Sequence, residues 1–93
     1  MKKDDTWKPR VKKHIVFREE DEGAFLFDPL TDELRCLNQS ASLIFPLLDG
    51  RHCVGDILRK LEKAYSQKDT EGLRQDLISF WEALAERGLT END

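Results

Sequence analysis

Residues 23–50 read GAFLFDPLTDELRCLNQSASLIFPLLDG, and the period of the apolar residues changes once within this stretch. Before residue 38 it contains two short runs, AFLFD and ELRCL, of the length and composition of β-strands. Between them, Pro29 favours a turn because its ring fixes φ near about −65°, and Asp28 and Asp32 tolerate turn conformations. The first part of the stretch therefore predicts two antiparallel strands.

After Leu37 the apolar period becomes about 3.6 residues, which is typical of a helix. Asn38 is a favourable N-cap, and the pair Asp49-Gly50 is a stop signal. We therefore expect a helix over residues 39–48. Pro46 lies inside it and is expected to bend its axis, because proline cannot donate a backbone hydrogen bond to the carbonyl of Ser42.

On the N-terminal side, HIVFRE at residues 14–19 predicts one more strand, followed by a polar turn that ends at Gly23. On the C-terminal side, apolar periodicity predicts helices over residues 54–65 and 70–87. The expected fold is therefore α+β and winged-helix-like, with a three-stranded antiparallel sheet followed by three helices.

The last helix carries two apolar stripes. With about 100° per residue, one narrow stripe is expected to face the core, and it consists of Leu73, Leu77, Phe80 and Leu84. A second flank lies between about 80° and 140° from Leu73, and it consists of Arg74, Ile78, Trp81 and Ala85. This second flank either packs on the sheet or on the first helix, or it forms a groove with the edge of a strand.

The third strand of such a sheet has an unpaired outer edge, which can accept a further strand. Glu33 and Arg35 are the charges that would instead protect this edge from pairing.

Charge divides the chain of 93 residues into two parts. Residues 1–13 carry six Lys or Arg and two Asp, so their net charge is +4, and the total of −4 leaves −8 for residues 14–93. We interpret residues 1–13 as a flexible basic arm and residues 14–93 as the folded domain. The acidic domain argues against nucleic-acid binding, which usually requires a basic face.

The sequence contains no recognisable catalytic or metal-binding pattern. Cys36 and Cys53 form no CxxC pair, and together with His14 and His52 they match no familiar zinc spacing. There is no glycine-rich phosphate loop and no supported Ser/His/Asp or Cys/His set. We therefore expect a protein that is not an enzyme and that uses no cofactor.

The longest stretch without a charge, Cys36 to Leu48, is shorter than the roughly 20 apolar residues of a membrane span. No apolar segment follows the basic N-terminus as in a secretory signal. The expected location is the cytoplasm, with no membrane partner.

The order of several short motifs resembles the PqqD family, also called the RiPP recognition element, over about residues 14–90. The motifs are FDP-x-T at residues 27–31, Leu37-Asn38, Leu48-Asp49-Gly50 and Arg87-Gly88-Leu89. Three positions depart from the family pattern: Asp32 stands where glycine is common, Pro46 where an ordinary helix former is usual, and Cys53 where Thr or Ser caps the second helix.

The resemblance implies a non-catalytic chaperone that binds the leader of a ribosomally synthesised precursor peptide and presents it to a modifying enzyme, such as a radical SAM enzyme. In this family the leader adds as a strand to the third strand and lies against the third helix. Carried over by position, the resemblance implies peptide contacts at Leu34, Arg35, Cys36, Leu37, Arg74, Leu77, Ile78, Trp81 and Ala85. The alternative is a winged-helix DNA-binding or regulatory domain, against which the charge of −8 argues.

Overall fold

The two predicted strand turns produce a three-stranded antiparallel sheet. The computed structural model describes residues 4–21, 23–65 and 70–91. Strand β1 (Val16–Glu20) pairs with β2 (Gly23–Asp28), and β2 pairs with β3 (Glu33–Leu37), so the sheet order is β1-β2-β3. The turn before β3 requires a positive φ at Asp32, which has φ 61°. The predicted sheet is confirmed.

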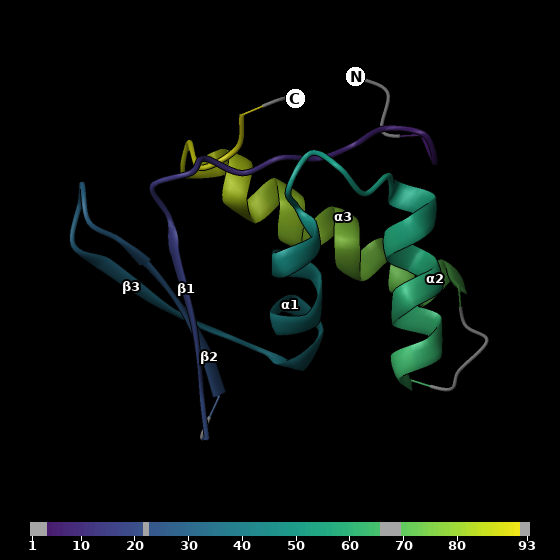
Figure 1. The fold of residues 1–93 in the computed structure, drawn as a ribbon, viewed down its shortest axis with the longest axis horizontal. Helices are drawn as coiled ribbons and strands as arrows, with labels where there is room; N and C mark the ends of the chain where they lie inside the picture. The colour runs from purple at the N-terminus through teal and green to yellow at the C-terminus, as the bar shows by residue number, and fades with distance from the viewer. Residues whose placement is uncertain (1–3, 22, 66–69, 92–93) are drawn as a thin grey trace.

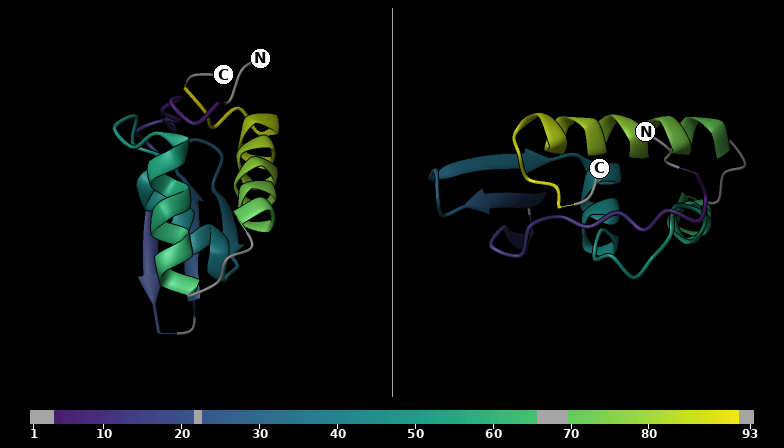
Figure 2. Two further views of the ribbon diagram at one scale, coloured as in Figure 1. Left: turned by 90° about the vertical axis from the view of Figure 1, so that its right-hand side faces the viewer. Right: turned by 90° about the horizontal axis from the view of Figure 1, so that it is seen from above.

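Three helices follow the sheet, as predicted. They are α1 (Gln39–Ile44), α2 (Val54–Tyr65) and α3 (Thr70–Glu86). The side chain of Asn38 caps α1 by accepting a hydrogen bond of 2.8 Å from the backbone N–H of Ala41. In Figure 1 the sheet lies on one side of α1 and α2 on the other, and Figure 2 shows α3 running past α1 from the sheet to α2.

The first helix is shorter than predicted. It ends at Ile44 and continues as one turn of 3₁₀-helix, η1 (Phe45–Leu47), instead of reaching Leu48 as α-helix. Pro46 explains the change, because it lacks the N–H that would continue the α-helical hydrogen bonds.

The core lies between the inner face of the sheet and the three helices. The central strand β2 contributes Ala24 and Leu26, and α1 contributes Ile44. Phe17 of β1 stacks on Phe45 with ring centroids 5.4 Å apart. Helices α2 and α3 contribute buried residues at helical spacing, namely Ile57, Leu58, Leu61, Leu73, Leu77, Trp81 and Leu84.

Residues 4–13, named the arm below, are packed against this core, whereas we predicted a flexible segment over residues 1–13. The carbonyls of Asp5 and Trp7 accept hydrogen bonds from the N–H groups of Gly55 and Val54. Those two amides lie in the first turn of α2, where no intrahelical acceptor exists. Within the described residues, the segments on the two sides of the boundary that we expected at residue 14 are therefore packed on each other.

The arm also joins the ends of other elements. Its Val11 N–H donates to the carbonyl of Leu48 after η1, and its Lys12 N–H donates to the carbonyl of Leu89 after α3. Figures 1 and 2 show the arm crossing the same end of the helices as the C-terminal segment. The arm therefore ties together α2, the end of η1 and the chain that follows α3.

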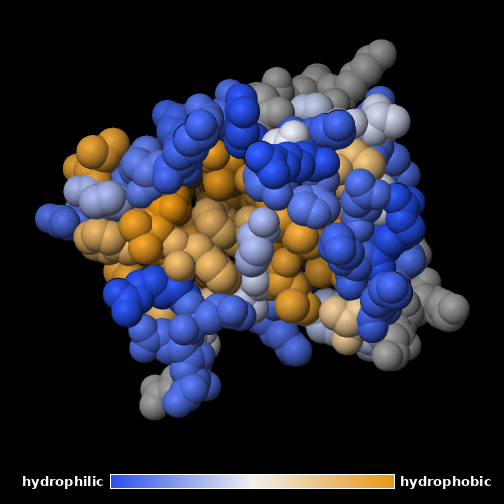
Figure 3. Space-filling view, in the orientation of Figure 1, coloured by the Kyte–Doolittle hydropathy of each residue, from blue (hydrophilic) through white to orange (hydrophobic). Residues whose placement is uncertain are grey.

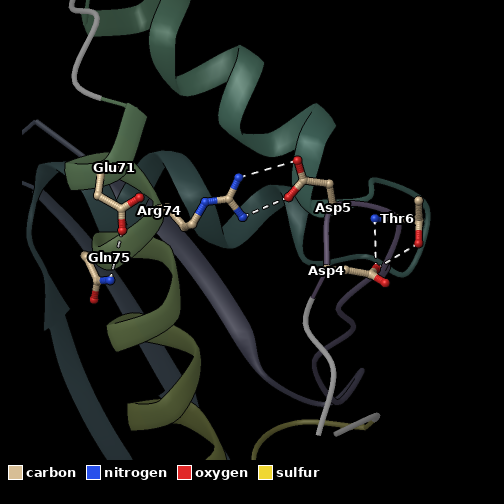
Figure 4. Close-up of polar contacts among 6 residues, drawn as sticks. All are labelled: Asp4, Asp5, Thr6, Glu71, Arg74 and Gln75. Carbon is tan, nitrogen blue, oxygen red and sulfur yellow. Dashed lines mark hydrogen bonds and ion pairs between the residues drawn. The ribbon is translucent and has the colours of Figure 1, made fainter.

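Two side chains anchor the arm to α3. The Trp7 ring meets the Trp81 ring edge to face, with centroids 4.8 Å apart and an interplanar angle of 88°. The Arg74 guanidinium donates two hydrogen bonds to the Asp5 carboxylate, at 2.8 and 3.4 Å (Figure 4). The hydrogen bond from Arg74 is the main cause that lowers the pKa of Asp5 below its ordinary value of 3.8.

Deletion of residues 1–13 tests the packing of the arm. We expect the unfolding free energy to fall by at least about 2 kcal/mol, because the deletion uncovers Trp81 and removes acceptors from α2. Urea and thermal melts of the shortened and full-length chains provide the measurement. Equal midpoints would show that the arm adds no stability, as the original prediction of a flexible segment implies.

The Asp5–Arg74 pair predicts a small acid-dependent effect. Because the pKa of Asp5 is lower in the folded chain, the pair stabilises the fold above the pKa of unfolded aspartate, and this contribution is lost as the pH falls through the folded-state pKa. In Arg74→Gln, the pKa of Asp5 is expected to rise toward its ordinary value. An NMR titration of the Asp5 carboxyl carbon measures this pKa, and an unchanged value would contradict the pairing.

Candidate functional site

The outer edge of β3 lies beside a hollow at one flank of α3. The hollow has a volume of about 140 Å³. The sheet and the start of α1 contribute Leu26, Arg35, Cys36, Leu37, Asn38 and Ala41, and α3 contributes Phe80, Ala83 and Leu84. The sheet order leaves the outer edge of β3 without a partner strand in the described part of the chain. We call this edge together with the hollow the groove.

The groove contains three of the four strand residues that we predicted to contact the peptide. Arg35, Cys36 and Leu37 line it. The Cys36 thiol is free and exposed, and its pairing with Phe25 directs it to the outer face of the sheet. Leu34 belongs to the other face of the sheet, because it pairs with Phe27, whose neighbour Leu26 is buried against the helices. Leu34 is 65% exposed.

That outer face of the sheet is notably apolar. Val16 and Leu34 both pair with Phe27, one on each side, and both are exposed. Figure 3 shows hydrophobic residues gathered on the side of the molecule where the strands lie, whereas hydrophilic residues predominate around α2.

The helix residues that we predicted to contact the peptide lie on the opposite flank of α3, away from the groove. Arg74, Leu77, Ile78 and Trp81 line a cavity with Trp7, Pro9 and Val54. This cavity has a volume of about 10 Å³, which is at the lower limit for a single water molecule. Trp81 is only 1% exposed. The arm therefore occupies the flank that we predicted to be open to a peptide.

Ala85 belongs to the same covered flank by its position on the helix. It follows Trp81 by four residues, so the two lie about 40° apart around the helix axis. Its side chain is half-buried, and it does not contribute to the lining of the groove.

The helix residues that face β3 are not among those that we predicted to contact the peptide. Phe80 was assigned to the core stripe, but it is half-buried and lines the groove together with Ala83. With Leu73 at zero, Ala83 lies near 280° and Phe80 near 340°, at about 100° per residue. Asp76 and Arg87 fall between these two angles, and their charges made this side resemble a solvent-facing surface. The small side chain of Ala83 among charged neighbours on the helical wheel is the one feature of the sequence that could have indicated a groove on this side.

An ion pair crosses one end of the groove. The Arg87 guanidinium, just after α3, donates to the Glu33 carboxylate at the start of β3 at 2.7 Å. It links β3 directly to the end of α3, at the exposed surface. The charge of Glu33 is therefore partly neutralised at the strand edge that it was predicted to protect.

A second, more open hollow adjoins the other end of the groove. It has a volume of about 340 Å³ and is lined by Asn38, Gln39, Ser40, Tyr65, Leu73 and Asp76. Asn38 lines both hollows, so the two are neighbours at the end of β3. Burial, and then the nearby Asp76 carboxylate, raise the pKa of the Tyr65 hydroxyl.

Each of the two histidines lies beside a carboxylate. His14 Nε2 lies 3.2 Å from a carboxylate oxygen of Asp28, and His52 Nδ1 lies 3.0 Å from one of Asp49. Within residues 4–21, 23–65 and 70–91, no three His, Cys, Asp or Glu side chains are grouped so that they could hold a metal ion. None of the helices in this part of the chain is both long and apolar enough to span a membrane.

Comparisons with known proteins agree with this geometry. The family model described as coenzyme PQQ synthesis protein D (PqqD) matches residues 23–89. A protein of Stutzerimonas stutzeri (strain A1501), named PqqA binding protein, is 35% identical over 51 residues, which are 55% of this chain and 53% of that protein. The chain thus matches about half the length of this curated relative.

Three solved structures have a similar fold. TbiB1 in complex with the TbiA(beta) leader peptide has a TM-score of 0.76 and 25% identity, covering 90% of this chain and 96% of that one. A lasso peptide synthetase B1 complexed with its leader peptide has a TM-score of 0.75 and 22% identity, covering 91% and 99% of the two chains. The PqqD part of Methylobacterium extorquens PqqCD, a stand-alone RiPP recognition element, has a TM-score of 0.74 and 23% identity, covering 90% and 88%.

The family match extends from the start of β2 to Leu89 and so includes the open strand, the helices and the whole groove. The chain therefore belongs to the PqqD family.

Proposed function

We propose that this protein binds the leader segment of a ribosomally synthesised precursor peptide, which adds as a fourth strand to β3. The observation that carries this proposal is the unpaired edge of β3 next to a hollow lined by apolar residues of α3. A strand added there is hydrogen-bonded through its backbone, and its alternate side chains point into the hollow. Backbone bonds supply affinity for many sequences, and the hollow selects among them.

The lining of the groove indicates which leader side chains fit. Phe80, Ala83 and Leu84 offer an apolar contact on the helix side, which favours an aliphatic or aromatic leader residue. Arg35 is half-buried in the same lining, and no ion pair joins its guanidinium to another side chain of the described residues. An acidic leader residue two positions from the apolar one would face the same side of the added strand and could pair with Arg35.

The protein would act without catalysing a reaction or holding a cofactor, by presenting the bound leader to a modifying enzyme. A radical SAM enzyme is the partner that the family resemblance implies. Two similar structures contain leader peptides, and a third is described as a RiPP recognition element, which supports this role. We place this activity in the cytoplasm, where the precursor is synthesised.

Peptide titration and DNA binding distinguish this proposal from the winged-helix alternative. The probes are fluorescent PqqA, the TbiA(beta) leader and the leader of any short precursor that is found encoded beside this gene. We expect one leader to bind and duplex DNA to bind only weakly, because the domain from residue 14 onward has a net charge of −8. Tight, sequence-selective DNA binding without leader binding would contradict the proposal.

Cys36→Pro tests the strand edge. Proline lacks the backbone N–H and distorts an edge strand, so leader binding is expected to be lost or greatly weakened. Cys36→Ser is the matched control, since it changes the side chain but retains the backbone donor. Circular dichroism establishes that both variants are folded. A folded proline variant with unchanged affinity would exclude pairing at β3.

The pair Ala83→Glu and Ala85→Glu tests which flank of α3 faces the peptide. The same substitution is made two residues apart on one helix, and only Ala83 lines the groove. Ala83→Glu is expected to weaken leader binding by about 1–3 kcal/mol, because it fills the hollow and places a charge in an apolar contact. Ala85→Glu should change the affinity much less. The reverse order, measured by fluorescence titration, would restore the flank predicted from the sequence.

A further inference from the structure

We infer that the arm fixes the position of α3 and thereby sets the width of the groove, with Trp7 as the positioning residue. The effect on the peptide rests on the proposed function, whereas the effect on the groove does not. Trp7 lines the small cavity on the far flank of α3 and is absent from the lining of the groove. Its influence on a bound peptide would therefore be exerted through the helix.

Helix α3 packs mainly on elements other than β3. The helix packs on α1 and α2, and Trp81 packs on Trp7. On the side of β3 there is instead a hollow of about 140 Å³, crossed at one end by the exposed Arg87–Glu33 ion pair. An exposed pair of this kind contributes little to positioning. The separation between α3 and β3 therefore depends on what packs on the other sides of the helix, namely α1, α2, the Phe45 ring against Phe80, and the arm.

The arm is itself attached to several elements of the fold. Trp7 contributes its backbone carbonyl to Val54 at the start of α2, and Pro9 contributes its carbonyl to Gly50 after η1. Further along, Arg10 accepts a backbone hydrogen bond of 2.8 Å from Glu91, beyond the end of α3. The indole of Trp7 is thus presented to Trp81 from a backbone that is fixed at several points.

Two adjacent residues link the two flanks of α3. Phe80 and Trp81 are adjacent in sequence, with Phe80 lining the groove and Trp81 lining the covered cavity. The cavity behind Trp81 is only about 10 Å³, so the Trp7 indole leaves α3 little room to move toward the arm. Loss of the Trp7 indole would open that space, and a shift of α3 into it would carry Phe80 and Ala83 away from Cys36.

The family model begins at residue 23, so the arm lies outside the matched residues. The Arg74–Asp5 ion pair gives the arm a second attachment, one turn before Ile78 on the same flank. Asp5 is exposed, so the indole contact, which is buried against Trp81, is the element to change in a test.

The experiment measures the groove without any peptide. One spin label is attached to Cys36 and one to Ala83→Cys, in a full-length chain that also carries Cys53→Ser. Dipolar broadening then reports the separation of β3 and α3. We expect Trp7→Ala to lengthen or broaden the distance distribution and Trp7→Phe to restore it, because phenylalanine retains an aromatic contact with Trp81.

Leu61→Ala is the control for a general loss of stability. Leu61 is 1% exposed on α2 and lines neither the groove nor the covered cavity, so this variant should be destabilised with an unchanged distance distribution. If Trp7→Ala leaves the distribution unchanged, or if Leu61→Ala changes it equally, the inference is wrong.

A leader titration of the unlabelled variants completes the test, with the leader that binds the unaltered chain as the probe. Trp7→Ala is expected to weaken binding at least about threefold, and Trp7→Phe and Leu61→Ala to weaken it less. A groove that widens without a change in affinity would contradict the proposed site of the peptide. A groove that does not widen would overturn the positioning role alone, so the two failures are distinguishable.

Discussion

Helix α3 carries apolar side chains on two opposite flanks, and only one of them is covered by another part of the chain. The core covers only the stripe between them. On one flank the arm supplies the cover, with the Trp7 ring against Trp81 and the Asp5 carboxylate on Arg74. The other flank is left with Phe80 and Ala83 beside an unpaired strand. Because the arm covers one flank and leaves the other open, the groove lies on the open flank only.

The open flank combines two features that are unfavourable in an isolated chain but useful for binding. An unpaired strand edge has backbone donors and acceptors without protein partners, and an apolar hollow exposes surface that water solvates poorly. A peptide strand satisfies both at once. The Glu33–Arg87 pair lies at one end of this site, and the open hollow next to Asn38 lies at the other. These two features define the ends between which a leader would lie.

Much of the fold followed from local patterns. The strand runs, the cap at Asn38, the positive φ tolerated by Asp32 and the range of α2 were all predictable, because each depends on neighbours in sequence. The length of α1 was overestimated, although the bend at Pro46 had been anticipated, because a proline can either kink an α-helix or convert its end to a 3₁₀ turn.

The sequence could not show which flank of α3 the arm covers, for a physical reason. A helical wheel gives the angles between side chains, but not the direction in which each stripe faces. Trp81 and Ile78 looked available because the cover for them lies more than sixty residues earlier, in a basic segment with few apolar residues. Composition suggested that residues 1–13 were loose, whereas one tryptophan and backbone hydrogen bonds are enough to pack residues 4–13.

Intermolecular nuclear Overhauser effects between a bound leader and the chain test the central claim most directly. If the leader adds to the sheet, backbone protons of the peptide will show regular cross-strand contacts with Glu33–Leu37, and its alternate side chains will contact Phe80 and Ala83. Contacts confined to other surfaces, with the backbone of β3 unaffected, would contradict the account.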